Sequence, residues 1–540
     1  MMIVTVKTKP YTDQKMGTAG LRKKTRVATQ ENYLENFLQS IFNIIPNLEQ
    51  KSFLVGGDGR YFNSVAIQKI IKIASANGVK KLYIGKDGLV STPAGSCIIL
   101  KNHLDGGFVL SASHNPGGID GDFGIKYANA SGGQCQPSES AAIYEQTQKI
   151  TSYKIADCPD FDLSKLATFR CENTEIEIID PYNDYIKMMG GIFDFNKLKQ
   201  LLTSDFRFIF DAMNGVTGPY AKKIFEEILG APKGSVIDGK PLEDFGGLHP
   251  DPNLIYAKHL VDIMYSDNAP DFAAANDGDG DRNMILGSHF FVSPSDCLAV
   301  LTDNYKLIPA YKNGIYGVAK SAATSMAVKR VADKLNIGYY EVPTGWKYFI
   351  HLMDTNRISF CGEESFGTGA SHIREKDGIW ATLFWLSIIA ETHKSVKEIV
   401  MSHWQKYGRN YYLRNDYEGI PQEIADKLMS DLEQSLPTLI GKKYGNYTIS
   451  DAHPFIYHDP VDNSSTQNGL IIHFTDESRI VYRLSGTGTN GATLRVYIER
   501  YVTDNFSEDS EKMLKDLENI SREIADIPGR TGKEQPDIVT

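Results

Sequence analysis

The segment best suited to bind a metal ion is Asp-Gly-Asp-Gly-Asp-Arg at residues 277–282. Three carboxylates alternate with glycine, which lets the loop turn tightly enough for the carboxylates to converge. Converging carboxylates repel one another unless a hard cation lies between them. A calcium loop of the EF-hand type is excluded, because its sixth position is Arg282 rather than Gly and its twelfth is Ser288 rather than Glu. Three ligands are therefore predicted to bind Mg²⁺ together with a phosphate oxygen: Asp277, Asp279 and Asp281.

A second segment, residues 111–118 (SASHNPGG), follows a short apolar run. Its Pro-Gly-Gly end predicts a turn with open backbone N–H groups, and Ser113 is a candidate exposed nucleophile. Adjacent side chains of an extended backbone point to opposite faces, so His114 is a poor candidate for the base of Ser113. A substrate contact is the better interpretation of His114.

A third segment, residues 483–491 (RLSGTGTNG), formally matches the dinucleotide-binding pattern G-x-G-x-x-G. That pattern requires a helix next, whereas residues 492–497 alternate like a strand, so the dinucleotide interpretation is rejected. Glycine N–H groups, two arginines and three hydroxyls instead indicate a cradle for phosphate. The side chains concerned are those of Arg483, Arg495, Ser485, Thr487 and Thr489.

The fourth segment, residues 361–367 (CGEESFG), is followed by residues 374–377 (REKD). Its carboxylates and Ser365 could accept and donate hydrogen bonds to sugar hydroxyls, and Lys376 could act as a general acid or base. A metal-assisted serine site combined with a separate phosphate grip indicates phosphoryl transfer on a phosphorylated small molecule.

Short apolar strands that alternate with helices must position these loops. Residues 53–57 and 107–110 are expected to be buried strands of a parallel, doubly wound sheet, and the same alternation returns twice before residue 410. Beyond residue 410, alternating segments and a closing helix indicate a different architecture. We therefore predict an α/β fold with mixed sheets in three related α/β domains (1–185, 186–295, 296–409) and a C-terminal α+β domain (410–540).

Composition excludes several classes of protein. The chain has 540 residues, 41% of them hydrophobic, and a net charge of −10 with no long basic run, which argues against disorder and against nucleic-acid binding. The longest apolar stretch, residues 379–390, is shorter than the roughly 20 residues of a membrane span. The N-terminus lacks the pattern of a signal peptide. The six cysteines include no CxxC pair, so neither a zinc site nor a disulfide framework is indicated, and a cytoplasmic protein is expected.

Taken together, the motifs resemble those of the eukaryotic-type phosphoglucomutases, a family of the α-D-phosphohexomutase superfamily. The resemblance runs in order along nearly the whole chain and rests on nine segments: residues 17–23 (GTAGLRK), 113–118 (SHNPGG), 121–126 (GDFGIK), 242–247 (LEDFGG), 249–254 (HPDPNL), 344–347 (TGWK), 362–367 (GEESFG), 407–410 (YGRN) and 537–540 (DIVT). Ala19 departs from the family, which usually has Ser there.

The resemblance implies four domains around one central cleft and a role for each matched residue. Ser113 would carry a phosphoryl group and contribute to the metal site. The remaining catalytic set would be His114, Lys126, Lys376 and Arg22. Sugar contacts would come from Thr344, Gly345, Glu363 and Ser365. The phosphate of the substrate would be held by Arg483, Ser485, Gly486, Thr487 and Arg495, with Arg282 near the phosphoserine.

The activity implied by the resemblance is interconversion of glucose 1-phosphate and glucose 6-phosphate, through a phosphoserine enzyme and glucose 1,6-bisphosphate, with Mg²⁺. The expected partners are small sugar phosphates, without nucleic acid, in a monomer or a dimer. Two alternatives stay open: a catalytically weak paralogue acting in trafficking or the cytoskeleton, and a mutase for another hexose phosphate.

Overall fold

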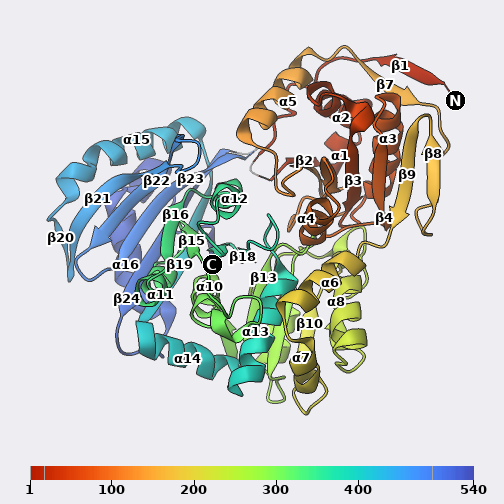
Figure 1. The fold of residues 1–540 in the computed structure, drawn as a ribbon. Helices are drawn as coiled ribbons and strands as arrows, with labels where there is room; N and C mark the ends of the chain where they lie inside the picture. Colours follow the sequence, from red (N-terminus) through yellow and green to blue (C-terminus); the bar gives the residue numbers. More distant parts are fainter. Residues whose placement is uncertain (1, 18, 489–490) are drawn as a thin grey trace.

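Four large sheets follow one another along the chain of this computed structural model, which describes residues 2–17, 19–488 and 491–540. Figure 1 shows the first unit (red to orange) and the last unit (blue) on opposite sides of the molecule, with the yellow and green units between them. Three units combine parallel and antiparallel strands, and the last is wholly antiparallel. The predicted fold class is confirmed, while the exact domain boundaries stay predictions.

The first unit is built on a seven-stranded mixed sheet whose central strands are parallel. In spatial order the strands are β2 (Leu21–Lys24), β6 (Asp122–Asn129), β5 (Gly106–Leu110), β3 (Ser52–Gly57), β4 (Lys81–Leu89), β9 (Thr174–Ile179) and β8 (Thr168–Cys171). A separate ribbon pairs β1 (Ile3–Lys7) with β7 (Ser152–Ala156). The helices are α1 (Thr25–Ala28), α2 (Tyr33–Ile44), a 3₁₀ turn (Leu48–Gln50), α3 (Asn63–Ala76), α4 (Thr92–Lys101) and α5 (Pro137–Lys149).

The second and third units have smaller mixed sheets. The second has β11 (Val236–Ile237), β10 (Phe208–Asp211), β12 (Phe272–Asn276), β13 (Asn283–Gly287) and β14 (Phe290–Val292), with α6 (Asn183–Ile192), α7 (Phe195–Leu202), α8 (Thr217–Ala221), a π-helical turn (Lys222–Ile228), a 3₁₀ turn (Phe245–Gly247) and α9 (Lys258–Met264). The third has β16 (Gly338–Val342), β15 (Gly317–Ser321), β17 (Phe360–Glu363) and β18 (Gly367–Ala370), with α10 (Pro294–Asp303), a 3₁₀ turn (Tyr305–Leu307), α11 (Ala327–Leu335), α12 (Lys347–Asp354), α13 (Gly378–Thr392) and α14 (Val396–Tyr407).

The last unit is a seven-stranded antiparallel sheet with three helices. Its strands in spatial order are β20 (Lys443–Tyr444), β21 (Tyr447–His458), β22 (Ser465–Phe474), β23 (Arg479–Gly488), β24 (Gly491–Val502), β19 (Arg409–Ile420) and β25 (Ile538–Val539). The helices are α15 (Gln422–Leu439), α16 (Ser510–Ile524) and α17 (Ile527–Thr531).

The candidate functional loops follow buried strands. Every residue of β5 and of β12 is buried, and the serine segment and the aspartate segment begin directly after them. The segment at residues 361–367, called the sugar segment below, begins within β17, which is also fully buried. In open α/β sheets, ligands bind at the carboxyl ends of such strands, so the topology gathers the candidate loops on the binding side of each sheet.

The longest apolar run of the sequence is a core helix. It forms α13, which is buried from Gly378 to Ala390 and lies in the same hydrophobic cluster as β12 and β17. Among the helices that the structure describes, none is long and apolar enough to cross a membrane.

The cysteines depart from the expectation. Cys158 and Cys171 form a disulfide, with their Cα atoms 6.0 Å apart, while Cys97, Cys135, Cys297 and Cys361 are free. Residue spacing carried no sign of this bridge, because the fold brings the chain after β7 next to the end of β8.

A buried histidine in α14 predicts acid sensitivity. Burial lowers the pKa of His403 to about 4, whereas an unfolded histidine takes a proton near pH 6.5. The stability that depends on neutral His403 is therefore present above pH 6.5 and is lost as the pH falls toward 4. Between pH 6.5 and 5 the loss is roughly 2 kcal/mol. We expect His403→Gln to reduce the fall in unfolding free energy between pH 7 and 5, measured by urea denaturation, while His458→Gln, at an exposed position, leaves that fall unchanged.

Candidate active site

The serine and aspartate loops meet at a direct side-chain contact. Ser113 Oγ donates a hydrogen bond of 2.6 Å to Asp277 Oδ2, and both side chains are buried. Ser113 has a φ of 54°, a conformation that is strained for a residue with a side chain. The Ser113 N–H donates to Ser111 Oγ at 2.7 Å, which helps to hold this conformation. The predicted nucleophile and metal loop are thus adjacent.

A buried ion pair holds the backbone of the serine loop through hydrogen bonds. Arg60 and Asp58 form an ion pair of 2.9 Å, and both side chains are fully buried. Arg60 Nη2 donates to the Ser113 carbonyl at 2.8 Å, and Arg60 Nη1 donates to the Asp122 carbonyl at 2.7 Å. Sequence reasoning missed this pair; the only signal was an Asp-Gly-Arg run after the strand at 52–57.

The three predicted metal ligands converge. One carboxylate oxygen from each of Asp277, Asp279 and Asp281 lies within 4.8 Å of the other two, and all three residues are buried. Asp279 Oδ1 and Asp281 Oδ1 have no hydrogen-bond partner among the described residues. Burial and the charges of Asp281 and Asp279 raise the pKa of Asp277 well above its ordinary value. An all-oxygen cluster with unsatisfied buried atoms fits a divalent cation.

Asn276, at the end of β12, connects the two ends of the aspartate loop at residues 277–282. Its Nδ2 donates to the Arg282 carbonyl at 2.9 Å, so the two ends of the loop are tied together. A Cβ atom added to Gly378 would lie only 2.3 Å from this Nδ2, which leaves room for glycine alone there.

Two lysines lie against the aspartates. Lys126 Nζ is 2.6 Å from Asp279 Oδ2, and Lys376 Nζ is 3.3 Å from Asp281 Oδ1. Burial would lower the pKa of Lys126, but Asp279 and Asp281 together raise it. Burial would raise the pKa of Asp279, but its contact with Lys126 holds this pKa below its ordinary value. Lys126 is therefore a permanent cation in this arrangement.

Arg22, Arg282 and His114 lie close to one another, and both arginines lie near the aspartate cluster. Arg282 Nη1 pairs with Asp251 Oδ1 at 3.0 Å, while the Nε atoms of Arg22 and Arg282 are buried and have no hydrogen-bond partner among the described residues. Burial, followed by the charges of Arg282 and Arg22, lowers the pKa of His114 well below its ordinary value. His114 is therefore neutral and lies beside two arginines. It is suited to contact an anionic group without adding a charge of its own.

The loop at residues 344–347 contacts both the sugar segment and the fourth unit. The Gly345 N–H donates to Glu363 Oε1 at 3.2 Å, and the Thr344 N–H donates to Asn468 Oδ1 at 3.1 Å. Thr344 Oγ1 is buried without a hydrogen-bond partner among the described residues, and Ser365 is half-buried. Glu364 points elsewhere: its Oε2 accepts from Ser321 Oγ at 3.0 Å, inside the third unit.

Glu375 is a further titratable residue that sequence reasoning missed. Its side chain is buried, and burial raises the pKa of Glu375 to about 7, although Lys126 acts to lower it. Its position beside Lys376 in the sequence was visible, but its burial was not.

The arginines of the phosphate segment lie side by side. Arg483 on β23 is paired directly with Arg495 on β24, and like charges at directly opposite positions of a sheet are destabilising. Arg483 Nη2 donates to the Tyr497 hydroxyl at 3.1 Å, and Arg495 Nε is 3.4 Å from Asp416 Oδ2. A bound anion would relieve the repulsion. Ser485 is half-buried on β23, the burial of Gly486 and the Thr487 side chain lie outside the described part of the chain, and Thr489 lies outside the described residues.

The predicted residues therefore form two groups. In the part of the chain that the structure describes, no hydrogen bond or ion pair connects Arg483 or Arg495 to the serine loop. Beside Lys126, a cavity of about 510 Å³ is lined by residues of the first unit and by Lys347 of the third. This volume is in the range of small-molecule sites, but Ser113, Arg483 and Arg495 are not among the lining residues.

Gly367 is predicted to be necessary for the position of Lys376. A Cβ atom at Gly367 would lie 2.3 Å from Lys376 Cδ, so Gly367→Ala must displace the flexible lysine. We expect kcat to fall about 10–100-fold, because 1 Å of misplacement can cost this much, with little change in melting temperature. The matched control is Gly191→Ala, where nothing lies within 4 Å of the added atom. Equal kcat values for the two variants would contradict the assignment of Lys376.

Known proteins resemble this chain over nearly its whole length. Models of the phosphoglucomutase/phosphomannomutase alpha/beta/alpha domains I, II and III match residues 13–154, 181–289 and 293–407, and the model of the phosphoglucomutase-1 C-terminal domain matches residues 409–537. The chain is 51% identical to a phosphoglucomutase of Rhizobium radiobacter and 49% identical to human phosphoglucomutase-1, over 100% of both chains in each case.

A solved structure shows the same fold. It is that of parafusin from Paramecium, described as an exocytosis-sensitive phosphoprotein and a phosphoglucomutase, in an open form; the TM-score is 0.93 at 45% identity, over 100% of this chain and 99% of that one. The chain therefore belongs to the phosphoglucomutase family of the α-D-phosphohexomutase superfamily, as its motifs predicted.

Proposed function

We propose that this protein is a phosphoglucomutase of the isomerase class that interconverts glucose 1-phosphate and glucose 6-phosphate. The observation that carries the proposal is the contact of Ser113 Oγ with Asp277 inside a convergent aspartate cluster. The paired arginines Arg483 and Arg495 supply a second anion site away from the serine, as a substrate with a non-reacting phosphate requires.

The proposed reaction consists of two phosphoryl transfers. The bond between Ser113 Oγ and phosphorus breaks while the 6-oxygen of glucose 1-phosphate bonds to phosphorus. Lys376, in its neutral form, takes the proton of the attacking hydroxyl, and Ser113 Oγ gains a proton as it leaves. The product, glucose 1,6-bisphosphate, then reverses its orientation. Ser113 Oγ next attacks the 1-phosphoryl group and loses its proton, the bond between phosphorus and the 1-oxygen of the sugar breaks, that oxygen gains a proton, and glucose 6-phosphate leaves.

Each remaining residue has a positioning or electrostatic part in this proposal. Asp277, Asp279 and Asp281 would hold Mg²⁺, which when bound neutralises charge on the transferring group. Arg22, Arg282 and neutral His114 contact the group on Ser113, and Lys126 stays protonated near it. Thr344, Gly345, Glu363 and Ser365 orient the sugar. Arg483, Arg495, Ser485, Gly486 and Thr487 hold whichever phosphate is not reacting.

The proposal also includes the predictions on partners, activator and cellular compartment. We propose small sugar phosphates as partners, without nucleic acid and in a monomer or a dimer, glucose 1,6-bisphosphate as activator and intermediate, and the cytoplasm as the compartment. Plant relatives are named chloroplastic, so cell fractionation with immunodetection is the direct test of compartment. The alternatives of an interaction paralogue or another hexose mutase are not favoured, because full-length relatives are named phosphoglucomutases.

Replacing Arg483 tests the proposed phosphate grip. Conversion of glucose 1-phosphate is followed with Mg²⁺ and a trace of glucose 1,6-bisphosphate, comparing Arg483→Gln with the exposed control Arg170→Gln. We expect loss of a charge-assisted contact worth about 1.5–3 kcal/mol, hence a fall in kcat/KM of about 10–100-fold, in Arg483→Gln only. Full activity of Arg483→Gln would contradict the assigned grip, and no activity in the folded parent protein would contradict the glucose reaction.

A further inference from the structure

We propose a second divalent-cation site in the second unit, formed by Asp211, Asp238 and His259 and suited to a transition-metal ion such as Zn²⁺. These residues lie outside the aspartate cluster of the active site, and none of them has a part in the proposed reaction. The site would fix the segment that supports the serine loop.

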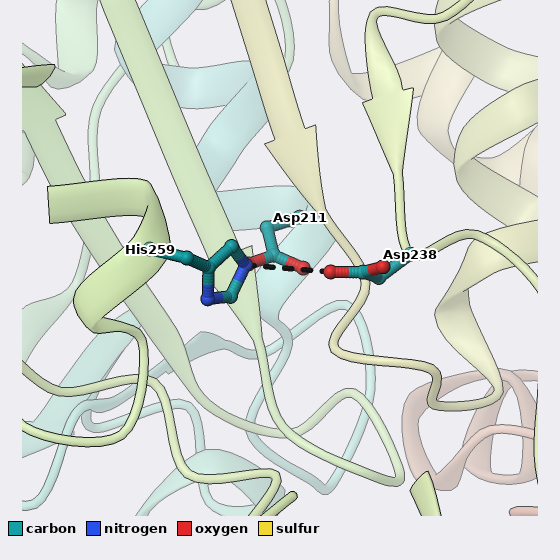
Figure 2. A group of neighbouring side chains, drawn as sticks. All are labelled: Asp211, Asp238 and His259. Carbon is teal, nitrogen blue, oxygen red and sulfur yellow. Dashed lines mark ion pairs between the residues drawn. The ribbon is translucent and has the colours of Figure 1, made fainter. Parts of the chain in front are cut away.

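Three separate elements supply the three side chains. Asp211 is the last residue of β10, Asp238 follows its parallel neighbour β11, and His259 lies in α9. Figure 2 shows the three side chains directed toward one another from these elements. His259 Nε2 lies 2.7 Å from Asp211 Oδ2 and 3.3 Å from Asp238 Oδ2. One ligand atom from each residue lies within 4.8 Å of the other two, so the atoms could surround a single ion.

Unsatisfied buried atoms are the second observation in favour of a ligand. Asp211 is 0% exposed, and its Oδ1 accepts a hydrogen bond of 2.8 Å from the Met213 N–H. Its Oδ2, which faces the cluster, has no hydrogen bond among the described residues, and neither does His259 Nε2. A buried carboxylate oxygen without a donor is costly, and a cation removes that cost. Asp211 thus has one oxygen held by the backbone, while the other has only the cluster partner His259 Nε2 near it and could bind an ion.

The competing interpretation is a protonated His259 between two carboxylates, because Asp211 and Asp238 raise the pKa of this imidazole. A protonated ring would make the 2.7 Å contact between Nε2 and Asp211 Oδ2 an ion pair, and this contact is also the largest cause of the raised pKa; the contact does not, however, have the direction of a good N–H hydrogen bond. Within the described chain, neither Asp211 nor Asp238 forms an ion pair with lysine or arginine. A metal ion satisfies all three ligand atoms at once.

The donor set indicates the kind of cation. One imidazole nitrogen with two carboxylate oxygens suits Zn²⁺ or a similar ion, whereas the all-oxygen set of Asp277, Asp279 and Asp281 suits Mg²⁺. The two sites should therefore differ in selectivity. Three protein ligands leave one position of a tetrahedral Zn²⁺ for water.

The segment that follows Asp238 connects this cluster to the serine loop. The Asn214 N–H donates to the Asp238 carbonyl at 2.9 Å, and the Leu242 N–H donates to the Asn214 carbonyl at 3.0 Å. Just beyond Leu242, the Glu243 carbonyl accepts from the Gly118 N–H at 3.0 Å. A cation held by Asp238 would therefore restrain the backbone that contacts the serine loop.

Zn²⁺ binding to the full chain tests the proposal, in the Asp277→Asn background so that the first cation site is weakened. The chain is stripped with chelator, titrated with Zn²⁺ alone by calorimetry, and assayed for bound metal after gel filtration. We expect one Zn²⁺ per chain and a rise in melting temperature. Adding His259→Gln should weaken binding at least about tenfold and abolish the rise.

Two further variants keep the test decisive. Adding Asp238→Asn, at a half-buried ligand, should give the same loss if His259→Gln disturbs folding. Adding His453→Gln, which removes a histidine 3.0 Å from Asp451 at the surface, should change nothing. Absence of Zn²⁺ binding in the Asp277→Asn protein, or equal binding in the His259 and His453 variants, would overturn the proposal and leave a protonated His259 as the bridge.

Discussion

Replacing Ser113 by alanine is expected to abolish conversion of glucose 1-phosphate while leaving the fold intact. The serine hydroxyl is the only group in the proposed reaction that bonds to phosphorus from the protein side. Removing a nucleophile of this kind costs at least about 10⁴-fold in kcat. The change deletes one hydrogen bond, Oγ to Asp277, and leaves the loop contacts of the Ser113 backbone in place. Initial rates and the thermal unfolding midpoint measure the two effects separately.

Ser111→Ala is the matched control for this experiment. It removes a hydroxyl from the same loop, where Ser111 Oγ accepts from the Ser113 N–H. We expect a partial loss of activity from a less well-held loop, well short of the loss in Ser113→Ala. Similar residual rates in the two variants would mean that the loop conformation, and not the Ser113 hydroxyl, is what the reaction needs.

Replacing Asp277 by asparagine is expected to separate metal binding from folding. Burial and two neighbouring carboxylates raise the pKa of Asp277, so in the metal-free protein stability falls as the pH rises from the ordinary carboxyl pKa toward the raised pKa and stays at the lower level above it. Asparagine resembles the protonated acid, so the metal-free variant should be at least as stable as the parent at pH 7. Loss of a ligand should lower kcat by about 10²–10³-fold and reduce the rise in melting temperature on adding Mg²⁺.

The contrasting variant is Asp279→Asn. Asp279 is the ionised partner of the buried Lys126, so its replacement leaves a buried cation without that partner and should lower stability even without metal. Both variants should lose activity, and only Asp279→Asn should lose metal-free stability. Metal-free destabilisation of equal size in both would refute the different charge states assigned to the two aspartates.

Local sequence predicted those parts of the site that are contiguous in the chain. The aspartates at 277–281 and Ser113 follow buried strands, so residue type and strand pattern sufficed to single them out as candidate metal ligands and nucleophile, and these roles stay predictions. The arginines at 483 and 495 were predicted as a phosphate cradle from their glycine and hydroxyl neighbours. Their direct pairing across two strands, which gives the physical reason for an anion there, appears only in the fold.

Features that depend on burial or on distant contacts could not be predicted in this way. Arg60 acts through carbonyls of the serine loop more than 50 positions away in the chain. The pKa of Glu375 depends on burial, which no local pattern reports. Cys158 and Cys171 meet because of strand placement, and Asp211, Asp238 and His259 come together from three elements.

The most direct test of the central claim is to follow the phosphoryl group itself. Glucose 1-phosphate labelled with ³²P is incubated with the protein, Mg²⁺ and a trace of unlabelled glucose 1,6-bisphosphate, and the quenched protein is digested and mapped by mass spectrometry. The account predicts ³²P in glucose 6-phosphate and on the peptide that contains Ser113, with both signals absent in Ser113→Ala. Labelled glucose 6-phosphate without label on Ser113, or label on another residue, would contradict transfer through this serine.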